Sequence, residues 1–222
     1  EIDEIGVVLM GGAGITPGYV QEQYNEGAIL ADGWLNSGDL GRFDSDGLLW
    51  LTGRAKDLII RGGHNIDPAV IEETLHQHEA VELAAAVGKP DSYAGEIPIA
   101  YVQLKPGAQA SAEELQAFVR EHIPERAANP ANIFLLDTMP QTAVGKIFKP
   151  ALRWDAIERV YSELLQPMSK EIGAKFMIAA SASDVHGTIV KINIGNININ
   201  EEIEKKISKL LSSFSIKYEI IS

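Results

Sequence analysis

The sequence contains no cysteine in its 222 residues. A chain without thiols forms no disulfides, offers no thiolate nucleophile and binds no metal through cysteine. It also has no apolar run long enough to span a membrane, and we recognise no signal peptide in it. These absences are typical of a cytoplasmic protein without a membrane anchor.

Positive charge is also scarce: 19 Lys and Arg residues stand against 31 Asp and Glu residues, a formal net charge of −12. This balance argues against nucleic acid or an anionic membrane as a partner, because phosphate-rich surfaces attract cations. A small polyanionic ligand remains compatible with the sequence wherever basic residues gather locally. From Glu171 onward Lys balances Asp and Glu, so the negative excess lies in the first 170 residues.

The length and the hydrophobic content of 45% are sufficient for a core in one large domain or two small ones. The chain opens on Glu1, and a strand-like run, Ile5–Met10, follows almost at once. We therefore expect the chain to be a piece of a longer protein. Its oligomeric state is not readable from the sequence, and a homo-oligomer stays an open alternative.

The stretch from Asp32 to Pro68 is rich in turn residues and fixed-spacing charges. The tetrad 44–47, Asp-Ser-Asp-Gly, predicts a tight turn that pairs residues 42–43 with the strand 48–51. Asp39, which we place at the end of a strand, and Arg54 would then fall near the same end of that hairpin. A carboxylate beside a guanidinium can bind a sugar diol, although a weak surface ion pair is the common alternative.

The next segment has the pattern of a small α+β domain with one sheet. Asp67 and Pro68 predict the start of a helix that reaches about His78. His76 and His78 would point to different faces of it, so we expect no metal site there. Further strands are predicted at Val81–Val87, Ile97–Leu104 and Ile133–Leu136, and a second helix starts at the capping box of Ser111 and Glu114.

The final part of the chain begins with a loop, Pro140–Lys146, in which Lys146 is the only cation. Alone, such a lysine would be taken for a solvated side chain. A helix follows and reaches about Leu165. The extension beyond it (residues 166–222) has the pattern β-α-β, with strands at 188–194 and 216–221 around a helix capped by Asn200.

Three separated motifs, in this order and spacing, resemble those of the adenylate-forming enzymes. They are Ser37–Asp39, then Gly53–Asp57 with Gly62–Gly63 and Ile71–Glu72, and finally Pro140–Lys146. Each motif is weak alone, but together they are specific. The chain resembles the C-terminal part of an acyl-CoA synthetase of that superfamily.

The resemblance covers roughly residues 5–154 and implies a fold class of α+β. Residues 1–55 would be the end of the β-barrel subdomain of a large adenylation domain. Residues 56–165 would form a small, mobile C-terminal domain with a central sheet, and residues 166–222 the β-α-β extension.

The resemblance also implies a two-step reaction in which ATP converts a carboxylic acid to an acyl-adenylate, and the thiol of CoA then displaces AMP. By position, Asp39 is similar to the residue that holds the ribose hydroxyls of ATP and AMP. Arg54 would assist it on the ribose and phosphate side. Lys146 would be catalytic, reaching the α-phosphate and the carboxylate oxygen during adenylation.

Further roles implied by the resemblance concern domain movement and CoA. Lys56 matches the hinge about which the small domain rotates between the two half-reactions. Gly63, together with Gly62, would line the tunnel that receives the pantetheine arm of CoA.

Two parts of the family's pattern are missing: the Thr/Ser/Gly-rich phosphate loop and the aromatic-Gly-Thr-Glu segment that holds Mg and adenine. Mg would be bound mainly by that upstream part, and we expect no metal site in this chain. We also expect that the chain cannot adenylate alone. The acid is unreadable, and two alternatives stay open: an adenylation domain that loads a carrier protein, and a non-catalytic binding module of the same fold.

Overall fold

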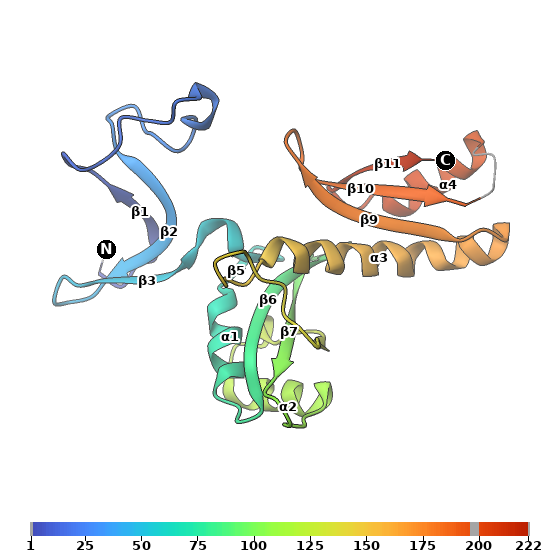
Figure 1. The fold of residues 1–222 in the computed structure, drawn as a ribbon, viewed down its shortest axis with the longest axis horizontal. Helices are drawn as coiled ribbons and strands as arrows, with labels where there is room; N and C mark the ends of the chain where they lie inside the picture. The colour runs from blue at the N-terminus through green and yellow to red at the C-terminus, as the bar shows by residue number, and fades with distance from the viewer. Residues whose placement is uncertain (1, 196–199, 222) are drawn as a thin grey trace. The chain divides into compact units, whose positions relative to one another are not determined.

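The computed structural model describes residues 2–195 and 200–221. The elements in this part of the chain are shown in Figure 1. The strands are β1 (Gly6–Met10), β2 (Leu35–Phe43), β3 (Leu49–Arg54), β4 (Ile59–Arg61), β5 (His64–Ile66), β6 (Val81–Asp91), β7 (Gly95–Leu104), β8 (Ile133–Leu135), β9 (Phe176–Ser183), β10 (Gly187–Ile194) and β11 (Lys217–Ile221). The α-helices are α1 (Pro68–His76), α2 (Ala112–His122), α3 (Lys149–Ile172) and α4 (Glu201–Leu211).

The chain divides into two compact units after Leu58. Unit 1 contains the residues up to Leu58 together with Asp67–Ala69, and unit 2 contains residues 59–66 and 70–222. The mixed α and β content agrees with the predicted α+β class.

Unit 1 is an antiparallel sheet in the order β1-β2-β3. The predicted turn is present, because Asp44 Oδ1 accepts hydrogen bonds from the backbone N–H groups of Asp46 and Leu48. The prediction that Asp39 ends a strand is wrong, since β2 continues through it to Phe43. Leu40 is the one large apolar side chain that is buried in the described part of this unit, so its own core is small.

The central sheet of unit 2 has the order β5-β4-β7-β6, and β8 pairs in parallel with β7. The β6–β7 hairpin is longer than predicted and pairs without interruption from Leu83 to Asp91. Both faces of the sheet are covered, which explains the continuous apolar runs in these two strands. One core contains Ile59, Ile71, Leu75, Val102, Leu115 and Val119, and the other contains Val87, Ile99, Tyr101, Met139, Leu152 and Ala156.

Helix α2 begins at the predicted capping box. Glu114 N–H donates to Ser111 Oγ at 3.1 Å, and Ser111 N–H donates to Glu114 Oε2 at 2.8 Å. Such reciprocal bonds satisfy two backbone donors that a helix start otherwise leaves without partners.

The C-terminal extension differs from the prediction in two ways. Helix α3 does not end near Leu165 but continues to Ile172 and stops at Gly173, whose φ of +67° suits a glycine at a helix end. A strand that was not predicted, β9, pairs antiparallel with β10, and β11 pairs with β10 in parallel. The extension sheet is therefore β11-β10-β9, with the chain order β-β-α-β.

Helix α3 connects one core of the central sheet with the core of the extension. Leu152 and Ala156 near its start belong to the core beside β6 and β7. Tyr161, Leu165 and Met168 belong to a separate core with the extension sheet and α4. Figure 1 shows β9 running alongside α3. The extension therefore packs on the later part of the helix whose first turns pack on the central sheet.

Candidate functional site

The predicted pair of Asp39 and Arg54 is present. The two residues are opposite each other in the β2–β3 register, and Arg54 Nε lies 3.1 Å from Asp39 Oδ1. Arg54 Nη2 also donates to the carbonyl of Ser37 at 2.9 Å. The side chain of Arg54 is 50% exposed and that of Asp39 is 36% exposed, so their ion pair contributes at most about 1 kcal/mol to stability.

The Ser37-Gly38-Asp39 motif shapes the backbone around this pair. Ser37 Oγ donates to the carbonyl of Val8 and accepts from the N–H of Asp39, which fixes the strand on both sides. Gly38 has a φ of +71°, and a Cβ there would lie 3.3 Å from Arg54 Nη2. The positive φ favours glycine at this position, and a side chain there would displace the guanidinium slightly.

Lys56 lies in a single 3₁₀ turn, Ala55–Asp57, between β3 and β4. The two compact units separate two residues later, after Leu58. This position is compatible with a hinge.

Gly62 and Gly63 form the two-residue turn of the β4–β5 hairpin, in which Arg61 pairs with His64. Their φ values of +56° and +87° are those of the mirror-image turns that hairpins favour, so the turn alone accounts for two glycines. A Cβ at either position would meet no atom within 4 Å. A ligand could therefore approach this backbone closely.

The loop that carries Lys146 is a closed hairpin. Gln141 and Ile147 form an isolated bridge, and Thr142 N–H donates to the carbonyl of Lys146 at 2.7 Å. Thr142 Oγ1 accepts from the N–H of Lys146 at 3.1 Å. Lys146 is exposed, and no carboxylate in the described residues forms an ion pair with it.

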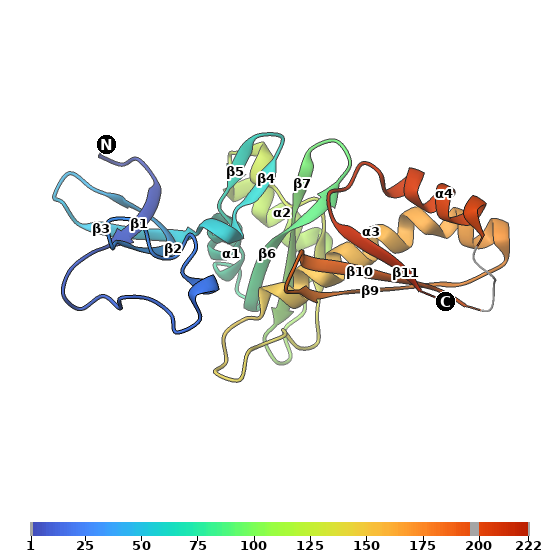
Figure 2. The ribbon, with the colours of Figure 1, turned by 90° about the horizontal axis from the view of Figure 1, so that it is seen from above.

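The candidate residues fall into separate groups. Asp39 and Arg54 lie together in unit 1, whereas Gly62, Gly63 and Lys146 lie in unit 2. Within unit 2, Figure 2 shows the β4–β5 hairpin at the top and the loop before α3 at the bottom, so these two segments lie apart. Unit 2 therefore presents two different surfaces that carry predicted functional residues.

One contact beside the Lys146 loop was not predicted from the sequence. Lys149 Nζ, at the first residue of α3, lies 2.8 Å from Glu72 Oε1 on α1. No local signal in the sequence could reveal this pair, because its members are brought together only when α1 and α3 pack on the central sheet.

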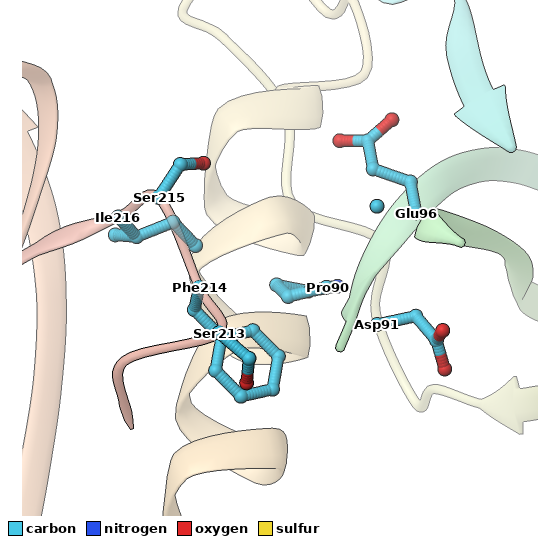
Figure 3. Close-up of a pocket in the computed structure, with 8 residues that line it drawn as sticks. Pro90, Asp91, Glu96, Ser213, Phe214, Ser215 and Ile216 are labelled. Carbon is cyan, nitrogen blue, oxygen red and sulfur yellow. The ribbon is translucent and has the colours of Figure 1, made fainter. Parts of the chain in front are cut away.

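A cleft of about 300 Å³ lies between the β6–β7 turn and the segment from α4 to β11. Figure 3 shows Pro90, Asp91 and Glu96 on one side of it and Ser213–Ile216 on the other. Both carboxylates serve the local backbone: Asp91 accepts from the N–H groups of Tyr93 and Ala94, and Glu96 accepts from the N–H of Ile60. The Ala94 and Tyr93 N–H groups also hold the pKa of Asp91 below its usual value.

No group of three or more His, Asp or Glu side chains in residues 2–195 and 200–221 could hold a metal ion. No helix in the same residues is long and apolar enough to cross a membrane.

Known proteins match most of this chain. Residues 70–146 match the family model described as the AMP-binding enzyme C-terminal domain. This part of the chain belongs to the AMP-binding, adenylate-forming family. The match begins in α1 and ends at Lys146, so it includes the central sheet of unit 2 and the lysine loop.

Relatives of this family member are CoA ligases. The marinolic acid–CoA ligase of Pseudoalteromonas sp. is 51% identical over 193 residues, which cover 87% of this chain and 29% of that protein. A long-chain-fatty-acid–CoA ligase of Bacillus subtilis is 42% identical over 149 residues, which cover 67% of this chain and 26% of that protein.

A solved structure of o-succinylbenzoate CoA synthetase from Bacillus subtilis, in complex with ATP and magnesium ion, has a TM-score of 0.62 and 37% identity. It matches 68% of this chain and 31% of that chain. The family member described here therefore spans less than a third of the length of each of these three proteins.

The marinolic acid–CoA ligase shares more than the family domain. A match that covers 193 of the 222 residues cannot end before residue 193, so it includes β9 and nearly all of β10. The sequence of that ligase therefore matches this chain into the extension and not only over the family domain.

Proposed function

We propose that the protein is an ATP-dependent acyl-CoA synthetase, of which this chain supplies the C-terminal part. The observation that carries the proposal is the pairing of Asp39 with Arg54 on β2 and β3, in a chain related to CoA ligases. An oxygen of the acid attacks the α-phosphorus of ATP and releases pyrophosphate. The sulfur of CoA then attacks the acyl carbonyl, releases AMP and gives up its proton.

Asp39 and Arg54 have the chemistry to hold the ribose of ATP. The Asp39 side chain is 36% exposed, and a carboxylate has acceptor sites beyond the one facing Arg54, which suit ribose hydroxyls. Arg54 retains donors beyond those used by Asp39 and Ser37, and these suit ribose or phosphate oxygens. We propose that the pair orients the nucleotide and that Lys146 stabilises the negative charge that develops during adenylation.

The other family residues are assigned to the second step. We propose Lys56 as the hinge, which its place near the boundary between the units supports. We propose the Gly62–Gly63 turn as the surface that the pantetheine arm of CoA passes, which the open space above both glycines supports.

The residues present do not fit a magnesium site of their own, because no suitable group of ligands occurs in the described residues. We therefore assign no step of the reaction to Mg in this chain. For the acid we propose a long-chain carboxylic acid, because two of the related ligases are named for marinolic acid and long-chain fatty acids. We propose a cytoplasmic location, which the absence of cysteine supports.

The ribose assignment is tested with the full-length protein and two variants, Asp39→Ala and the control Asp46→Ala. Asp46 is an exposed acidic residue of the neighbouring turn. We expect AMP release with CoA and a long-chain acid in the wild type and the control. In Asp39→Ala, kcat/KM for ATP should fall on the order of 10- to 100-fold, because a charged hydrogen-bonding partner of the ribose is lost.

The thermal stability of Asp39→Ala should stay within about 1 kcal/mol of the wild type, because the ion pair is exposed. Unchanged use of ATP by Asp39→Ala would contradict the assignment of Asp39. An inactive wild type across fatty, aromatic and short acids would contradict the proposed synthetase activity itself.

A further inference from the structure

Glu72 is a partly buried acidic residue that binds two groups through one oxygen. Its Oε1 accepts from the backbone N–H of Ala86 on β6 at 2.7 Å and lies 2.8 Å from Lys149 Nζ. The side chains of Glu72 and Lys149 are only 19% and 21% exposed. The pair therefore ties together α1, the edge strand β6 and the first residue of α3.

The start of α3 carries uncompensated positive charge, which this carboxylate offsets. The N-terminus of a helix carries partial positive charge, and a cation there is unfavourable. Helix α3 begins with Lys149, has no acidic residue in its first turn and has no side-chain cap at Phe148. Glu72 supplies from another helix the negative charge that the start of α3 lacks.

The start of α3 is also the end of the Lys146 loop. Lys146 precedes Lys149 by three residues, and the N–H of Phe148 donates to the carbonyl of Pro140 at 2.8 Å, which closes the base of the loop. The other closing bonds of the loop lie between Thr142 and Lys146. Any movement of the first turn of α3 is consequently transmitted to Lys146 through very few bonds.

We infer that Glu72 and Lys149 are positioning residues for Lys146, acting through the hairpin that precedes α3. This inference rests on the proposed function of Lys146 in adenylation. Neither residue needs to touch the substrate. A displacement of about 1 Å in a catalytic group can cost on the order of 100-fold in rate, so a pair that fixes the loop has a measurable effect on catalysis.

The activity test uses the full-length protein with Glu72→Gln and Lys149→Met, and it separates the two half-reactions. Gln at position 72 keeps an acceptor for Ala86 N–H but loses the charge. We expect kcat for acyl-adenylate formation to fall on the order of 10- to 100-fold, with KM for ATP changed by no more than about threefold. Thioester formation from added acyl-adenylate, which does not use Lys146, should stay within about twofold of the wild type.

The chain offers matched controls. Glu73→Gln removes the same charge from the next, exposed position of α1, and Lys170→Met removes an exposed cation near the end of α3. Both should leave the two half-reactions unchanged. Lys149→Arg keeps the cation and should restore most of the adenylation rate, which a loss of packing alone would not explain.

A second readout does not depend on activity. Amide hydrogen exchange at Thr142, Lys146 and Phe148 should become faster on the order of 10-fold in Glu72→Gln but not in Glu73→Gln, while the amides of β7 keep their protection. The inference is overturned if Glu72→Gln matches Glu73→Gln in loop exchange, or if both half-reactions fall equally. If the wild type forms no acyl-adenylate, the proposed function fails, and the exchange contrast alone decides whether the pair positions the loop.

Discussion

Replacement of Leu165 by Ala should unfold the extension while leaving the central sheet intact. Leu165 is fully buried on α3, in the core that also contains Val190 of β10 and Ile207 of α4. The first turns of the same helix pack in a different core, where Leu152 is buried beside β6 and β7. A cavity at Leu165 therefore opens in one core and not in the other.

The magnitude follows from the complete burial of this side chain. Removal of a buried leucine side chain costs about 2 to 5 kcal/mol, and more where the surroundings cannot collapse. A folded region of the size of the extension with its half of α3 has a total stability of about 3 to 10 kcal/mol, at roughly 0.05 to 0.15 kcal/mol per residue. The substitution should thus remove a large part of the stability of the extension.

Amide hydrogen exchange distinguishes unfolding of the extension from unfolding of the central sheet. In Leu165→Ala, the amides of β10 should lose protection on the order of 10²-fold or more, whereas those of β7 keep theirs. The control is Leu115→Ala, which places a cavity in the core beneath α2 and should have the opposite pattern. Equal loss of protection in β7 and β10 in both variants would refute the reasoning, because the cores would then unfold as one.

Two further predictions concern CoA and pH. Gly63→Leu should retain acyl-adenylate formation, whereas its rate of thioester formation should fall by at least about 10-fold, because a side chain would enter the space above the turn. The two steps are measured separately. An equal loss of both would contradict the CoA assignment. Burial raises the pKa of Tyr161 to about 12, and burial, followed by the hydrogen bond to Asp155, raises the pKa of Tyr101. Since both folded values exceed the unfolded value of about 10, their contribution to stability is complete below about pH 10 and is lost as the pH rises above it. The phenolate absorbance of Tyr101 and Tyr161 should therefore appear only as the protein unfolds. It is assigned by comparing the wild type with the Tyr101→Phe and Tyr161→Phe variants. Ionisation of either tyrosine in the folded protein near pH 10 would contradict this prediction.

Local signals predicted the features that depend on a few neighbouring residues. The turn at Asp44, the capping box of α2 and the pairing of Asp39 with Arg54 each follow from the chemistry of adjacent side chains or from the register of one hairpin. Such features form the same way in many folds, so a single sequence is sufficient to recognise them.

Features that depend on tertiary packing were missed. Strand β9 (Phe176–Ser183) is rich in Ala and Ser, which have little strand preference, and it is held by its pairing with β10. Pro167 lies inside α3, where a proline usually ends or bends a helix. The buried side chains of Leu165 and Met168 on either side of it stabilise the helix through this point.

The candidate site residues were predicted in the same uneven way. Lys146 was predicted only because its loop occurs together with two other motifs, since a single exposed lysine carries no functional signal. The contact between Glu72 and Lys149 could not be predicted, because it depends on how α1 and α3 both pack on the central sheet.

The most direct test of the account is pyrophosphate exchange without CoA, measured on the full-length protein and its Lys146→Ala variant. The acids should include long-chain, aromatic and short carboxylic acids. We expect exchange with a long-chain acid in the wild type and a decrease on the order of 10²- to 10³-fold in the variant, the size of effect expected when a preorganised cation is lost. Exchange that is equal in the two proteins, or absent with every acid, would contradict the proposal that this chain completes an acid-activating enzyme.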